Sequence, residues 1–163
     1  MNTTLFVTTL VVGQMAANCY IVIDQQTKKA LIIDPGDDAE YIGDTIIKLG
    51  VIPIGIVLTH GHFDHVLGAF ALQVSFGITC AIHPADQFLL ARMQDSAKHF
   101  LGVSYVDPPP RIDNALYDGQ VLKVGGSTLL IQEIPGHTPG SVMVYDKASE
   151  SVFVGDVMFA EGG

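Results

Sequence analysis

Residues 59–65 read Thr59-His60-Gly61-His62-Phe63-Asp64-His65, so four potential metal ligands occur within six residues. An apolar run over residues 54–58 predicts a buried strand that ends just before them. On such a backbone His60 and His62 point to the same side, whereas Asp64 and His65 leave the following turn in another direction. This geometry suits two neighbouring metal ions better than one. Imidazole with carboxylate favours zinc, iron or manganese over calcium or magnesium; the alternative is a histidine-rich exposed loop.

The sequence before this motif predicts a strand, a helix and a second strand. Residues 30–33 form a short apolar run, typical of a strand that is buried on both faces. Asp37 or Asp38 can cap a helix that Gly50 ends. The apolar stripe of this helix comprises Ala39, Ile42, Ile46 and Leu49. A helical crossover joins parallel strands, so at least part of the sheet is parallel.

The remaining elements follow from periodicity and turn residues. A second helix is expected over 66–76, and Pro84 suits the first turn of a third helix. That third helix would place Ala85, Leu89, Met93 and Ala97 on one face. Residues 101–119 show little periodicity and predict a long loop. Strands are expected at 5–12, 19–24, 78–82, 121–124, 128–134, 141–145 and 152–154.

Two segments of the sequence resemble each other. Residues 20–34 and residues 142–156 each predict a strand, a five-residue turn and a strand that ends in aspartate. The first copy continues through a helix and a strand to His60, whereas the second stops seven residues after Asp156. If the halves are related, the polypeptide ends before its second half is complete.

The composition limits the class of protein. A chain of 163 residues with 48% hydrophobic and 15% charged residues predicts one folded domain over 1–163. Its net charge of −9 argues against a nucleic-acid partner. The apolar run at 5–12 is too short to span a bilayer and follows no basic residue, so it predicts the first strand of a cytoplasmic protein. Cys19 and Cys80 are expected to be buried thiols.

Two further motifs supply candidate ligands. His137 lies within Pro135-Gly136-His137-Thr138-Pro139-Gly140, and Asp156 follows Gly155 at the end of the second hairpin. Alone, His137 could be a turn residue and Asp156 a helix cap. Asp34 could orient a ligand histidine, although a helix cap is the favoured interpretation. His83 is expected to be structural or to support a ligand, rather than to bind metal itself.

Together these motifs resemble the metallo-β-lactamase fold superfamily, and within it the glyoxalase II (hydroxyacylglutathione hydrolase) branch. The resemblance extends over essentially the whole chain. It rests on Asn18-Cys19-Tyr20, Asp34-Pro35-Gly36, residues 59–65, residues 135–141 and Gly155-Asp156. The implied fold is α/β, an αββα sandwich of two mixed sheets, here with its second half incomplete.

The resemblance also implies a site with two divalent metal ions. His60, His62 and His137 would hold one ion, Asp64 and His65 the second, and Asp156 would bridge both. Zinc is the expected metal, with iron or manganese as alternatives. The family pattern has one more histidine after the bridging aspartate, whereas this chain has none after His137. The second metal site and the activity of the 163-residue chain are therefore in question.

The implied function is hydrolysis of thioesters such as lactoylglutathione. A hydroxide on the metal, oriented by Asp64, would attack the acyl carbonyl, and the weakly basic thiolate would leave. One alternative is a persulfide dioxygenase with a single iron on His60, His137 and Asp156. The other is an inactive fragment that self-associates through its incomplete sheet. The expected partner is a small-molecule thioester, with no membrane or nucleic acid.

Overall fold

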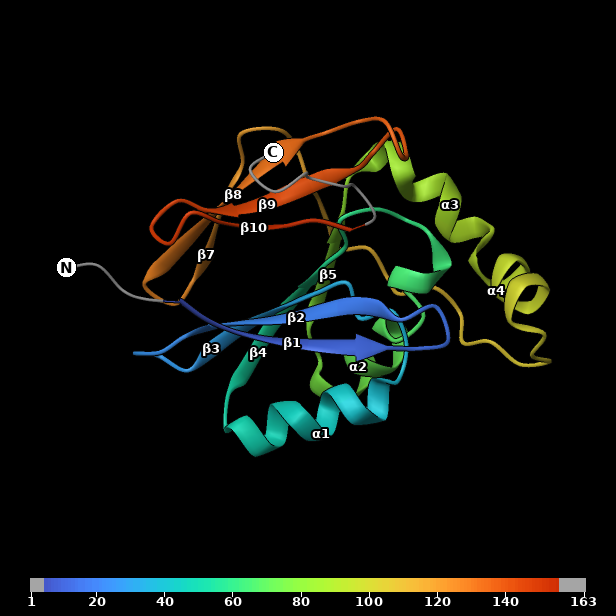
Figure 1. Cartoon of the computed structure of the whole chain (residues 1–163), viewed down its shortest axis with the longest axis horizontal. Coiled ribbons are helices and arrows are strands. Elements are labelled where there is room, and N and C mark those ends of the chain that lie inside the picture. Colours follow the sequence, from blue (N-terminus) through green and yellow to red (C-terminus); the bar gives the residue numbers. More distant parts are fainter. Residues whose placement is uncertain (1–4, 156–163) are drawn as a thin grey trace.

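A computed structural model describes residues 5–155, which form two β-sheets with helices at one face and one end (Figure 1). The helices α1 and α2 cover one face of the larger sheet, and the smaller sheet packs on its other face. In the described part of the chain, no helix lies over the outer face of the smaller sheet. These layers correspond to the expected α/β sandwich of two sheets.

The larger sheet is mixed and has the strand order β1-β2-β3-β4-β5-β6. Its strands are β1 (Leu5–Val12), β2 (Ala17–Asp24), β3 (Lys29–Ile33), β4 (Ile52–Val57), β5 (Thr79–Ile82) and β6 (Asn114–Ala115). Short turns join the first three strands, which are therefore antiparallel. A helix connects β3 to β4 and another connects β4 to β5, so these strands pair in parallel. The parallel carboxyl ends bring the loops after β3, β4 and β5 to one edge.

The smaller sheet has the order β10-β9-β8-β7. Its strands are β7 (Val121–Val124), β8 (Ser127–Glu133), β9 (Val142–Asp146) and β10 (Ser151–Phe153). The expectation of two mixed sheets holds for the larger sheet, whereas the described strands of the smaller one are all antiparallel. The reason is that tight turns at 125–126 and 147–150 join its outer strands, and the longer loop at 134–141 also reverses the chain direction.

The helices differ from expectation at two places. They are α1 (Ala39–Leu49), α2 (Ala69–Phe76), α3 (Gln87–Ala91) and α4 (Met93–Leu101), with short 3₁₀ turns η1 (Phe63–His65) and η2 (Pro84–Asp86). The second helix begins at Ala69 rather than Val66 because η1 precedes it. The expectation of one continuous third helix is wrong. Pro84 begins a 3₁₀ turn, and the helix that follows is interrupted at Arg92. The His83 ring accepts a hydrogen bond from the Ala85 amide (3.0 Å) and thereby stabilises the tight turn.

Two apolar clusters stabilise the layers. The first lies between the larger sheet and its helices and includes Ile42, Ile46 and Leu72. The second lies between the two sheets and includes Ile33, Ile131 and Phe153. No described helix is long and apolar enough to cross a bilayer.

Both cysteines are free and buried, as expected from the sequence. Burial raises the pKa of the Cys19 thiol, and the nearby Asp34 carboxylate raises it further. Burial likewise raises the pKa of Cys80, with Asp113 adding to the effect. Both thiols therefore stay protonated at neutral pH and are poor nucleophiles.

Asp24 connects the two sheets at the end remote from the histidines. Its buried carboxylate accepts hydrogen bonds from the Thr27 hydroxyl (2.6 Å) and the Thr27 amide (3.1 Å) in the β2–β3 turn. It also accepts from the Ser127 hydroxyl (2.9 Å) and the Gly126 amide (3.3 Å) in the smaller sheet. These bonds, led by that from the Thr27 hydroxyl, lower the pKa of Asp24.

This lowered pKa predicts a pH-dependent contribution to stability. A carboxyl with a lower pKa in the folded chain stabilises the fold above its unfolded pKa, and loses that contribution as pH falls through its folded pKa. Between about pH 5 and pH 3, the free energy of unfolding should therefore fall more steeply for wild type than for Asp24→Asn. Urea denaturation at a series of pH values measures both slopes, and Asp44→Asn on the exposed side of α1 is the control. Equal slopes for wild type and Asp24→Asn would contradict the prediction.

Candidate metal centre

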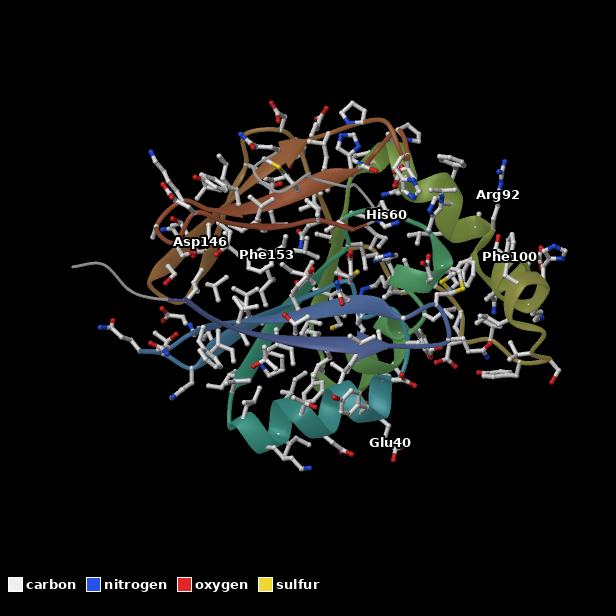
Figure 2. The ribbon with its side chains drawn as sticks, viewed as in Figure 1. Glu40, His60, Arg92, Phe100, Asp146 and Phe153 are labelled. Atoms are coloured by element: carbon white, nitrogen blue, oxygen red, sulfur yellow. The ribbon has the colours of Figure 1, made fainter. Side chains whose placement is uncertain are left out.

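Three histidines from two loops meet at the edge formed by the strand ends. His60 and His62 follow β4, and His137 lies in the loop between β8 and β9. The Val142 amide donates to the Thr59 carbonyl (2.9 Å), which holds the start of β9 beside the end of β4. His60 is buried, His62 is half-buried and His137 is exposed, so the cluster opens from the interior toward solvent. Figure 2 shows His60 at the end of the space between the sheets, toward α3.

The donor atoms of His60, His62 and His137 fit a single metal ion. One ring nitrogen from each lies within 4.8 Å of the other two. The His62 Nδ1 and His137 Nε2 atoms are 3.0 Å apart. Two nitrogens bound to tetrahedral zinc at 2.0–2.1 Å would be about 3.3 Å apart, so the His62–His137 pair needs only a small adjustment. The expected convergence of these three histidines is present in the structure.

A second group of potential ligands lies beside the first. Donor atoms of Asp34, His60 and His65 also lie within 4.8 Å of one another, and all three residues are buried. The His60 and His65 rings are 4.3 Å apart between centroids. The His65 Nε2 atom lies 3.6 Å from Asp64 Oδ2, so these two expected ligands of a second metal are adjacent.

Asp34 orients His65 and does not cap α1. The residue at the N-cap position of α1 is Asp38, four positions later, and its side chain makes no capping hydrogen bond. The buried Asp34 carboxylate instead accepts hydrogen bonds from the Thr59 amide (2.7 Å) and hydroxyl (2.5 Å), and lies 3.0 Å from His65 Nδ1. A carboxylate on one ring nitrogen fixes the tautomer that leaves the other nitrogen available to a metal. The helix-cap interpretation favoured from the sequence is therefore wrong.

Gly36, two residues after Asp34, allows this loop to approach the histidine motif. A Cβ atom at Gly36 would overlap the carbonyl oxygen of Asp64. The Gly68 amide donates to the Pro35 carbonyl (2.8 Å) and secures the same loop against the start of α2. The Asp34-Pro35-Gly36 motif thus positions Asp64 and His65 through its backbone as well as through its carboxylate.

Asp86 joins the two histidine loops and was not singled out from the sequence. Its fully buried carboxylate accepts from the Gly61 amide (2.9 Å), which lies between His60 and His62. It also accepts from the Thr138 hydroxyl (2.7 Å) and the Gly140 amide (2.7 Å), which flank His137 on its C-terminal side. One carboxylate thereby fixes the separation of the loops that carry the three histidines.

His83 is structural, as expected. Besides accepting from the Ala85 amide, its ring lies 3.1 Å from a Glu133 carboxylate oxygen through Nε2. Asp156, the expected bridging ligand, lies outside the described residues. Gly155 immediately before it is so close to His60 that an added Cβ would lie 2.5 Å from the ring.

An open pocket of about 390 Å³ adjoins the cluster. His62 and Asp64 form part of its wall, and apolar side chains from η1, α3 and α4 form much of the remainder. The structure therefore combines potential metal ligands with space for a small molecule, as a substrate site requires.

Comparison with known proteins agrees with this fold. The family model described as "Metallo-beta-lactamase superfamily" matches residues 12–163. This chain belongs to the metallo-β-lactamase superfamily, whose members are usually metal-dependent hydrolases.

Relatives of this chain include a hydrolase and two proteins of known structure. "Hydroxyacylglutathione hydrolase GloC" of Haemophilus influenzae is 36% identical over 148 residues, covering 89% of this chain and 68% of that protein. The structure of the BLEG-1 B3 metallo-β-lactamase has a TM-score of 0.84 at 29% identity, covering 94% of this chain and 73% of that chain. The structure of TTHA1623 in a di-iron-bound form has a TM-score of 0.81 at 31% identity, covering 93% of this chain and 73% of that chain. The expected superfamily and fold are confirmed.

Proposed function

We propose that this chain is a metal-dependent thioester hydrolase of the glyoxalase II type. The observation that carries the proposal is the convergence of His60, His62 and His137 beside a pocket. These three residues would hold one divalent ion, and Asp64 and His65 would contribute to a second, with Asp156 between them. Similarity to a protein named hydroxyacylglutathione hydrolase supports the substrate class.

The chain's own residues suggest how the reaction would proceed. A divalent ion, when bound, would supply Lewis acidity for an acyl carbonyl and for the attacking water. Asp64 is half-buried at the pocket wall, where its carboxylate can orient that water toward the carbonyl carbon. Attack would form a bond between the water oxygen and the carbonyl carbon, and the water's proton would pass to solvent. Collapse of the tetrahedral adduct would then break the carbon–sulfur bond, and the sulfur would leave as a weakly basic thiolate. Asp34 holds His65 throughout, because its carboxylate is buried and fixed by Thr59.

Metal removal provides the direct test of this proposal. Chelation followed by dialysis should abolish lactoylglutathione hydrolysis by the 163-residue chain, and zinc, iron or manganese should restore it. Metal content measured on the same samples should follow the activity. Turnover with no metal bound would overturn the mechanism, and absence of turnover of any thioester at full metal occupancy would overturn the proposed activity of this chain.

The same samples distinguish the alternative oxygenase. One ferrous ion per chain with oxygen consumption on a persulfide, and no thioester hydrolysis, would identify a dioxygenase. Thioester hydrolysis without oxygen consumption would support the hydrolase.

A further inference from the structure

The pocket beside His62 and Asp64 has mainly apolar walls. Besides these two residues and Gly61, seven side chains form it: Met15, Phe63, Leu89, Arg92, Met93, Ser96 and Phe100. They come from the β1–β2 turn, from η1 and from the α3–α4 pair, so distant parts of the sequence build one surface.

Two of these apolar side chains are notably exposed. Phe100 is 67% exposed and Met15 is 52% exposed, although each faces the pocket. Phe100 stacks on Phe63, with ring centroids 5.8 Å apart and an interplanar angle of 11°. Exposed apolar surface that lines a pocket favours an apolar ligand, because binding removes that surface from water.

Arg92 does not make the pocket a polar one. Its guanidinium carbon lies 5.3 Å from the centre of the Phe88 ring, and Phe88 is not among the pocket residues. The charged group is thereby held at the margin, while the aliphatic part of the side chain can cover apolar surface. Figure 2 shows Arg92 and Phe100 on the α3–α4 side of the molecule, with the Arg92 side chain extending outward.

We infer that this pocket binds an apolar acyl chain, so that the preferred thioesters carry acyl groups longer and less polar than lactoyl. The inference rests on the proposed thioester hydrolysis and specifies its substrate class. With the thioester carbonyl next to His62 and Asp64, an acyl chain would extend between the Phe63–Phe100 pair and Leu89. A lactoyl group would place a hydroxyl there and leave most of the apolar wall in water.

Binding of non-hydrolysable thioethers tests the pocket without requiring turnover. S-hexylglutathione and S-methylglutathione differ by five methylenes, and each fully buried methylene strengthens binding about fourfold. Half-burial of the five predicts a preference for the hexyl compound of about 30-fold, measurable by calorimetry.

Variants assign this preference to the pocket. Ser96→Phe places a ring in the open space and should reduce the preference to below about threefold. Ser104→Phe adds the same ring at an exposed position outside the pocket and should retain it. Phe100→Ala removes one exposed side chain from the pocket wall and leaves the core intact. It should lower the preference for the hexyl compound at least threefold. Thermal unfolding should show that all three variants are folded.

The outcomes separate this inference from the proposed function. Equal binding of the two thioethers, or a preference that survives both Ser96→Phe and Phe100→Ala, would overturn the acyl-chain pocket. Hydrolysis of acetylglutathione and hexanoylglutathione with equal kcat/KM would also overturn it while leaving thioester hydrolysis intact. A hexyl preference that depends on the pocket, without hydrolysis of any thioester, would support the pocket and overturn the proposed function.

Discussion

Replacing His62 with alanine is expected to weaken binding of a divalent metal ion at least 100-fold. The substitution removes the His62 Nδ1 atom, which lies 3.0 Å from His137 Nε2. Only His60 and His137 of the three-histidine group then remain. Loss of residues that merely orient ligands commonly costs 10- to 100-fold in affinity, so loss of a ligand should cost at least the upper value. Competition with a chromophoric chelator measures the affinity, and lactoylglutathione hydrolysis should fall in proportion to metal occupancy.

The fold should tolerate this substitution, because His62 is half-buried and lies in a loop. His99→Ala removes an exposed histidine in α4, outside the cluster, and should leave metal affinity unchanged. Equal metal affinity in wild type and His62→Ala would remove His62 from the site. A loss that is equally large in His99→Ala would point to a nonspecific effect of removing histidine.

The strands and the histidine motif could be predicted because their signals are local. The apolar run before His60 and the glycine after α1 each determine structure within a few residues. The convergence of His137 with His60 and His62 could not follow from local pattern. It required the resemblance to a family, because the loop between β8 and β9 meets the end of β4 only in the assembled sheets.

The residues that hold the site together gave weaker signals. Asp34 and Asp86 are acidic residues near the ends of strands, where a helix cap or a surface charge is an ordinary interpretation. Their partners, Thr59 and Gly61, lie 25 residues away in each case. Helical periodicity across 84–97 likewise predicted one continuous helix, whereas the chain forms the 3₁₀ turn η2 after His83 and breaks again at Arg92. The two-residue strand β6 is too short to show any periodicity.

Replacing Asp86 with alanine is expected to lower the free energy of unfolding by about 3–5 kcal/mol. The change removes the acceptor for the Gly61 amide, the Thr138 hydroxyl and the Gly140 amide. A buried donor left without an acceptor costs about 1–3 kcal/mol, and three donors are affected. Urea denaturation measures the loss. The control is Asp44→Ala on the exposed side of α1, which should change the free energy of unfolding by less than about 0.5 kcal/mol.

Asp86 should also affect metal affinity, because its partners belong to both histidine loops. We expect Asp86→Ala to weaken metal binding about tenfold under conditions in which the variant remains folded. Asp86→Asn keeps one oxygen acceptor, so its stability and metal affinity should lie between those of wild type and Asp86→Ala.

Combining Asp86→Ala with Thr138→Val isolates the bond between Asp86 and the loop that carries His137. If this 2.7 Å contact stabilises the fold, the double variant should be more stable than the sum of the two single losses predicts, by about 1 kcal/mol. Strict additivity, together with unchanged metal affinity in Asp86→Ala, would show that Asp86 only fills space. Coupling with weakened metal binding would show that the carboxylate sets the distance between His137 and the two histidines that follow β4.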